Sequence, residues 1–286
     1  MLMLRVMTWI SLRLGRPAGR AVLHLIAAYF VLFAPASRAA SRDYLARVLG
    51  RPARLAEVYR HVFTFAATIH DRIYLLNQRF DLFDIEVVNA DLLHAAMADG
   101  KGVFLLGAHM GSFEAMRALG RRHAGTRIAM AMYEENARKI NQTLAAINPE
   151  AQQDVIALGR IDSMLKVREE LERGALVGML ADRSLGADDS LPVTLLGAPA
   201  RLPQGPFRMA ALLGRPVFFM AGLYRGGNRY EVRFEPLADF TGLARGQRQA
   251  AVAAAIARYA QLLENHCRRT PYNWFNFFHF WNKAQP

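Results

Sequence analysis

Two patterns of apolar and polar positions follow one another along the chain, and the change comes near residue 100. Residues 41–98 have the spacing of helices, whereas short apolar runs alternate with helical stretches after that point. Alternation of this kind, with strands apolar on both faces, predicts an α/β fold with a largely parallel central sheet flanked by helices. The runs predicted to be buried strands are 102–108, 127–133, 154–159, 175–181, 192–197, 216–224 and 230–237, and the predicted helices are 112–122, 136–147, 162–173, 206–213 and 246–268.

The amino-terminal 40 residues form a distinct hydrophobic segment. Residues 21–34 are an apolar run of 14 residues preceded by several arginines. As a helix this run rises about 21 Å, which is shorter than the roughly 30 Å hydrocarbon core of a bilayer. A cleaved signal peptide, a buried helix and an uncleaved helix in or on a membrane all remain open. We predict a membrane-anchoring or interfacial segment over 1–40, then one domain over 41–286, with a helical lead-in over 41–98 and an α/β core over 99–286.

Composition and charge narrow the class of protein. Hydrophobic residues make up 53% of the chain and charged residues 21%, which excludes a disordered or low-complexity protein. The single cysteine excludes an intrachain disulfide and a cysteine-built zinc site. A formal net charge of +12 calls for an acidic partner, either nucleic acid, anionic lipid or an acidic carrier protein. The arginines are scattered and no nucleic-acid-binding signature is present, so we predict no nucleic-acid partner.

The candidate chemistry begins where the first predicted strand ends, in the segment GAHMGSFEA. His109 and Glu114 stand there, at the edge of a parallel sheet where ligands bind. Five residues of continuous helix would turn the two side chains about 140° apart, but Gly111 permits a turn and Ser112 can cap a following helix. Glu114 would then lie in the first helical turn and accept a hydrogen bond from one imidazole nitrogen. This pairing would make the other nitrogen a stronger base.

A histidine paired with a carboxylate, with no nucleophile of its own, suits removal of a proton from a substrate hydroxyl. The chain contains a second pair of the same spacing, His94 and Asp99, but no strand leads into it. We therefore interpret His94 as a surface or helix-packing residue. On spacing alone, a purely structural role for His109 also stays open.

The run GVFLLGAHMGSFE resembles the first motif of the glycerolipid acyltransferase superfamily, H-x4-D or H-x4-E, and most of all the branch of lipid A biosynthesis (late) acyltransferases. The resemblance extends from about residue 100 to the end of the chain. It implies transfer of a fatty acyl chain from a thioester to a hydroxyl of a lipid acceptor such as a lipid A-type glycolipid, with His109 as general base and Glu114 as its partner. It also implies acyl carrier protein or acyl-CoA as donor, no metal or cofactor, and a place on the cytoplasmic face of the inner membrane.

Later strand ends carry residues that the resemblance implies for substrate binding. Arg160 matches the arginine of the second family motif, which is implied to contact phosphate. Asp182 and Arg183 stand where glycerol-phosphate acyltransferases carry an E-G-T-R-like motif, but this chain reads ADRS, and the lipid A branch also has an aspartate there. Asn136 and Lys139 follow another predicted strand and are expected to line the acceptor pocket.

The carboxyl-terminal run PYNWFNFFHFW, residues 271–281, contains seven aromatic residues. Aromatic side chains at this density either pack over the core as a flap or lie at a membrane–water boundary. Other functions also fit the residues. A lysophospholipid acyltransferase, a thioesterase or lipase-type hydrolase that uses water or Ser112, and a non-catalytic membrane-binding protein are the alternatives.

Overall fold

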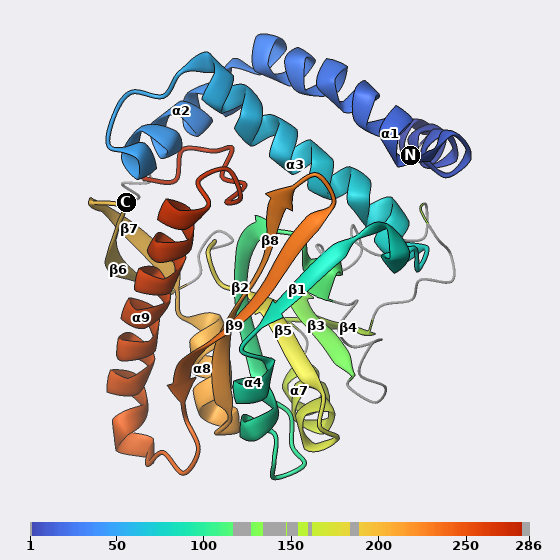
Figure 1. The fold of residues 1–286 in the computed structure, drawn as a ribbon. Helices are drawn as coiled ribbons and strands as arrows, with labels where there is room; N and C mark the ends of the chain where they lie inside the picture. Colours follow the sequence, from blue (N-terminus) through green and yellow to red (C-terminus); the bar gives the residue numbers. More distant parts are fainter. Residues whose placement is uncertain are drawn as a thin grey trace.

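Seven strands form the central sheet of the protein, which the computed structural model describes over residues 2–116, 127–133, 147, 154–159, 162–183 and 189–281 (Figure 1). The strand order is β1-β9-β8-β2-β5-β3-β4, and every neighbouring pair is parallel except β8 with β9. The predicted α/β fold with a largely parallel sheet is therefore confirmed. The strands are β1 (Asp84–Val88), β2 (Phe104–Gly111), β3 (Ile128–Tyr133), β4 (Asp154–Leu158), β5 (Leu176–Leu180), β8 (Pro216–Gly226) and β9 (Arg229–Asp239).

Two strands lie outside the sequence prediction. β1 falls in the segment predicted to be helical, because it alternates polar and apolar residues at the sheet edge and lacks the continuous apolar run that marked the other strands. β7 (Ala198–Pro203) pairs with β6 (Ser190–Leu195) in a separate antiparallel hairpin, so the predicted strand at 192–197 does not join the central sheet. Leu196 and Gly197 connect the hairpin strands with φ values of 51° and 76°, as a type I′ turn requires.

The helices cover the sheet on both faces and across one end. Helices α1 to α3 lie across the end of the sheet shown at the top of Figure 1, and α9 runs along one side of it. The predicted helix at 136–147 falls almost wholly outside the described residues. The helices are α1 (Leu2–Phe33), α2 (Pro35–Leu49), α3 (Leu55–Leu76), α4 (Ala90–Ala96), α7 (Ser163–Glu172), α8 (Gly205–Leu213) and α9 (Arg248–Arg269), with short 3-10 turns at Phe80–Leu82 and Arg245–Gln247.

The core has two parts, and strand β2 contributes to both. Phe104 and Leu106 are buried in one hydrophobic cluster, whereas Leu105 is buried in the other, as expected for a central strand with apolar side chains on both faces. Trp274 and Phe280 of the aromatic tail belong to the first cluster. These two aromatic side chains therefore pack in the core and do not lie at a membrane–water boundary.

Helix α1 lies largely outside this core. It contains a kink at Gly15, and its stretch Ser11–Phe33 is long and apolar enough to cross a membrane. Only 22% of that stretch is buried inside the protein, through side chains such as Leu23 and Ala27. The apolar surface that remains is available to a lipid environment.

Candidate active site

The site is built on the carboxyl end of β2. His109 lies near the end of this strand, and Gly111 makes the turn that follows with φ of 64°. A Cβ atom at Gly111 would lie 1.9 Å from the backbone oxygen of Gly222, so only glycine fits there. Ser112 Oγ then accepts a hydrogen bond of 3.3 Å from the backbone N–H of Ala115. Ser112 thus caps the helix that begins at Phe113, as the sequence predicts.

The side chain bonded to the His109 ring is Asp182, which follows strand β5. His109 Nδ1 lies 2.8 Å from Asp182 Oδ1, and the backbone N–H of His109 donates to Asp182 Oδ2 at 3.1 Å. Because a carboxylate only accepts hydrogen bonds, Nδ1 carries the proton and the other ring nitrogen, Nε2, is left with a free lone pair. His109 is 37% exposed, whereas Asp182 is fully buried.

The charge of Asp182 is held by its neighbours. Burial by itself would raise the pKa of this carboxyl group. The charge and the hydrogen bond of His109, together with the Arg183 guanidinium and the Trp274 N–H, outweigh burial and hold the pKa well below its usual range. Asp182 is therefore ionised at any pH near neutrality. A fixed carboxylate of this kind orients an imidazole and stabilises it once it gains a proton.

The aromatic tail closes the site from the other side. Trp274 Nε1 donates to Asp182 Oδ2 at 2.9 Å, and the backbone N–H of Phe275 donates to the backbone oxygen of His109 at 2.8 Å. The backbone N–H of Gly111 donates in turn to Asn273 at 2.9 Å. Residues 273–275 therefore pair with the end of β2 through an antiparallel bridge between Trp274 and Met110, the residue after His109.

Glu114 has a different partner from the one expected. Its Oε1 lies 2.8 Å from Arg72 Nε on α3, and Ser112 Oγ is 3.4 Å from its Oε2. Within the described residues, no hydrogen bond joins Glu114 to His109. The expected contact is not formed because Asp182 occupies Nδ1 while Arg72 draws the Glu114 carboxylate toward α3. Both His109 and Glu114 nevertheless line the same cavity.

That cavity has a volume of about 960 Å³. This is in the range of lipid-sized and drug-sized ligand sites, and its walls are mainly apolar. Its lining includes the ionisable side chains of His109, Glu114, Arg72 and Arg183. The apolar walls come from α3, from strands β3 to β5, from α8 and from the tail, through side chains that include Phe65, Ile69, Met130, Met132, Leu158, Met179, Met209, Phe277 and Phe278.

Of the predicted substrate-binding residues, some lie outside the described residues and the others differ in whether they line the cavity. Asn136, Lys139 and Arg160 lie outside the described residues. Arg183 lines the cavity, with its guanidinium donating to the backbone oxygen of Phe275 and lying over the ring of Phe278. Asp182 is fully buried, its two oxygens accept hydrogen bonds from His109 and Trp274, and it is not among the residues that line the cavity.

Sequence reasoning missed two residues of the site. Arg72 lies in the helical lead-in and Trp274 in the tail, and neither belongs to a motif that marks it. Only the fold brings them to the end of β2. The one available signal for Trp274 was the density of aromatic residues around it.

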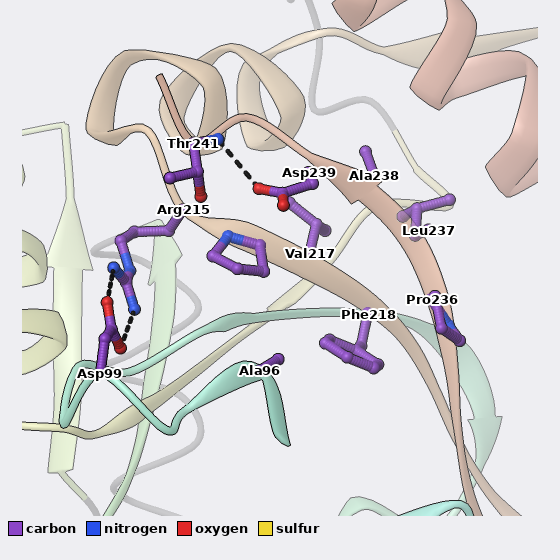
Figure 2. A pocket seen from close by; sticks show the side chains of 11 residues that line it. Ala96, Asp99, Arg215, Val217, Phe218, Pro236, Leu237, Ala238, Asp239 and Thr241 are labelled. Atoms are coloured by element: carbon purple, nitrogen blue, oxygen red, sulfur yellow. Dashed lines mark hydrogen bonds and ion pairs between the residues drawn. The ribbon is translucent and has the colours of Figure 1, made fainter. Parts of the chain in front are cut away.

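A second cavity, of about 500 Å³, lies between the loop after α4 and the β8–β9 hairpin. Figure 2 shows that its charged side chains already have partners: Arg215 binds Asp99 through two hydrogen bonds of 2.8 and 3.1 Å. Asp239 likewise accepts the backbone N–H of Thr241 at 2.9 Å. Asp99 is thus bound to Arg215, and the cavity lining contains no histidine. Of these two cavities, the one beside His109 is therefore the candidate active site.

A histidine–aspartate pair opening on an apolar cavity suits an enzyme that moves a proton to or from an apolar substrate. Residues 2–283 match the family described as bacterial lipid A biosynthesis acyltransferase. The chain belongs to this family, and the match covers nearly the whole chain. The family resemblance noted at the first motif is therefore confirmed. A search among curated proteins finds no match. The family indicates acyltransferase activity on a lipid and association with a membrane.

Proposed function

We propose that the protein transfers a fatty acyl chain from an acyl thioester to a hydroxyl group of a lipid A-type glycolipid, with His109 as general base. The observation that carries the proposal is the state of the His109 ring. Its Nδ1 is held by buried Asp182, whereas the ring itself lines an apolar cavity of about 960 Å³. This arrangement leaves a basic nitrogen where a lipid hydroxyl can reach it.

The reaction follows from that geometry. His109 Nε2 takes the proton of the acceptor hydroxyl as the hydroxyl oxygen attacks the thioester carbonyl carbon. The tetrahedral intermediate collapses, the carbon–sulfur bond breaks, and the proton on Nε2 passes to the leaving sulfur. Asp182 stabilises the imidazolium that exists between the two proton transfers, and the negative charge of Glu114 in the same cavity adds to this effect.

The first turn of the helix after Ser112 supplies donors for the oxyanion. The first N–H groups of a helix have no acceptor within the helix, and here they belong to Phe113 and Glu114. Both residues line the cavity that contains His109. Backbone donors in such a place stabilise the negative oxygen of the tetrahedral intermediate.

Substrate binding uses the positive charges of the cavity. Arg183 and Arg72 can bind a phosphate of the acceptor or of the donor's pantetheine arm. We keep Arg160 as a further candidate because it matches the second family motif, and Asn136 and Lys139 because they follow a predicted strand. The net charge of +12 suits an acidic acyl carrier protein or the phosphates of coenzyme A as donor, and it suits an anionic membrane surface.

We place the protein at the cytoplasmic face of the inner membrane, with residues 1–40 as its anchor. Leu25 and Phe33 of α1 are 73% and 69% exposed, so this helix presents large apolar side chains to its surroundings. A basic helix with such a face is suited to a membrane interface. Residues 41–98 then connect the anchor to the catalytic core at 99–286.

The proposal can be tested by incubating the purified protein with acylated carrier protein and a lipid A precursor. Mass spectrometry then identifies the products. His109→Ala should slow transfer by a factor of about 10² to 10⁴, the usual contribution of a general base. His94→Ala, in the other H-x4-D pair, is the matched control and should act as wild type. Near-wild-type transfer by His109→Ala would refute the proposal. Free fatty acid without acylated acceptor would instead favour the hydrolase.

A further inference from the structure

Trp274 connects the catalytic pair to the helices that cover the site. Its side chain is fully buried, its indole N–H donates to Asp182 Oδ2 at 2.9 Å, and its backbone oxygen accepts from His61 Nε2 at 2.8 Å. His61 lies on α3 and is itself bonded to Ser41 on α2. The tail that carries Trp274 passes between α9 and the α2–α3 layer (Figure 1).

The two oxygens of Asp182 have separate tasks. Oδ1 faces the ring of His109, whereas Oδ2 receives the backbone N–H of His109 and the indole N–H of Trp274. Without Trp274, the hydrogen bonds to both oxygens would come from His109 alone, so the carboxylate and the imidazole could turn together. The indole N–H, rigidly held in the core by the Trp274 ring, prevents that rotation.

We propose that Trp274 is a positioning residue for catalysis, because its indole N–H orients Asp182 so that the carboxylate holds His109 in the reactive tautomer. The inference rests on the proposed role of His109 as general base. It adds a residue of the tail to the active site and makes the tail part of the catalytic machinery. Trp274 itself does not line the cavity, so it acts through Asp182 alone.

Trp274→Phe removes the indole N–H and keeps an aromatic ring. We expect kcat to fall about tenfold, the effect of one hydrogen bond to a charged group, with KM for both substrates unchanged. Without the donor, more negative charge stays on the carboxylate beside His109, which raises the affinity of that ring for a proton. The acidic limb of the kcat/KM profile should therefore move to higher pH by a few tenths of a unit.

Other charged and titratable groups surround this pair and must be considered in the pH profile. Tyr259 on α9 is buried, donates to the backbone oxygen of Gly107, and has a pKa raised well above its usual value by burial. Cys267 on the same helix has a pKa raised by burial. Both therefore stay neutral near pH 7. The groups that carry charge there are Asp182 and Arg183 after β5, Glu114 after β2 and Arg72 on α3. Trp274→Phe leaves each of these in place.

The matched control is Trp281→Phe. The Trp281 indole N–H donates to the backbone oxygen of Leu195 at 3.1 Å, in the same tail but outside the site. The chemical change is identical. We expect kcat to stay within about twofold of wild type and the acidic limb of the pH profile to stay within about 0.1 unit, on the order of assay precision. A second variant that replaces Trp274 with 3-benzothienylalanine keeps the ring shape and removes only the donor, so it answers the question even if Trp274→Phe folds poorly.

The results distinguish the positioning role of Trp274 from the general-base role of His109. If His109→Ala is inactive while both Trp274 variants match Trp281→Phe in kcat and pH profile, the positioning role is refuted and the general base stands. If His109→Ala remains active, the proposed function fails first. A rise in KM alone, with kcat and the pH profile unchanged, also overturns the positioning role.

Discussion

His109 and Asp182 are joined by a 2.8 Å hydrogen bond although 73 positions separate them in the chain. Strand β2 and strand β5 are hydrogen-bonded neighbours, so residues that follow their carboxyl ends meet at one edge of the sheet. Glu114 is only five positions from His109 but turns away with its helix toward Arg72. The neighbouring strand therefore supplies the orienting carboxylate.

Asp182→Asn should reverse the protonation of the His109 ring. Two donors face the Oδ2 position, the backbone N–H of His109 and the indole N–H of Trp274, so the amide oxygen must take that place. The amide NH₂ then faces Nδ1 and forces the proton onto Nε2. We expect kcat to fall by a factor of about 10³ to 10⁴ with little change in KM, measured by steady-state acyl transfer.

Asp99→Asn is the control for that substitution, because Asp99 pairs with Arg215 at the other cavity. It makes the same change of a carboxylate to an amide and should keep wild-type kcat. An Asp182→Asn variant with near-normal kcat would show that another group orients His109.

A double-mutant cycle tests whether Glu114 is held by Arg72. Their side chains are 6% and 19% exposed, so Arg72→Met leaves a buried carboxylate without its cation and should cost up to about 3 kcal/mol of unfolding free energy. Adding Glu114→Gln should recover part of that loss, with a coupling of about 1–3 kcal/mol. Thermal or denaturant unfolding measures all four proteins.

The pair Arg79 and Asp81 gives the matching exposed case. Its side chains are 53% and 62% exposed, so a cycle there should show a coupling below about 1 kcal/mol. If Glu114 and Arg72 coupled no more strongly than this pair, the Glu114 carboxylate would be free to turn toward His109.

Much of the fold follows from local patterns. Strands β2, β3, β5 and β8 are apolar runs bounded by turns, and the structure has each of them within a few residues of its predicted range. β1 was not predicted because Asp84 and Glu86 interrupt its apolar residues, so it has no continuous apolar run. β6 pairs with β7 and not with the central sheet, because the two-residue turn at Leu196 and Gly197 brings the two strands together as a hairpin.

The site divides in the same way. The turn at Gly111, the cap at Ser112 and the place of His109 at a strand end all depend on a few consecutive residues, and the sequence predicts them. Arg72 and Trp274 reach the site only through packing of α3 and the tail onto the sheet. No spacing in the sequence contains that information, so the partners of His109 and Glu114 could not be assigned from it.

The exposed face of α1 should control membrane binding. Leu25, Tyr29 and Phe33 follow one another at four-residue spacing on one side of the helix, and they are 73%, 59% and 69% exposed. Replacing all three with serine removes apolar surface that would enter the interface. We expect at least about a tenfold loss of partitioning into anionic vesicles, measured by sedimentation.

Leu165 on α7 and Leu212 on α8 provide the control for this change. They are 60% and 55% exposed and lie on helices away from α1. Leu165→Ser with Leu212→Ser should leave vesicle binding unchanged. Equal binding by the α1 variant and wild type would exclude this face as the membrane contact.

His61 makes the fold sensitive to acid. Burial lowers the pKa of this histidine to about 4 from an ordinary value of 6.5, and its hydrogen bond to the Trp274 carbonyl offsets burial only in part. Between about pH 6.5 and 4, His61 is therefore neutral in the folded protein but protonated in the unfolded chain. Its contribution to stability is present above pH 6.5 and is lost as the pH falls toward 4, by a total of about 3 kcal/mol.

His61→Gln removes the titrating group, so this part of the pH dependence should disappear. We expect the difference in unfolding free energy between wild type and His61→Gln to shrink steadily from pH 7 to pH 4, because only wild type loses the histidine contribution. His279→Gln, at an exposed histidine of the same tail, should follow the wild-type curve throughout. Parallel curves for wild type and His61→Gln would mean that His61 takes up its proton in the folded state. The link from α3 to Trp274 would then not depend on a neutral imidazole.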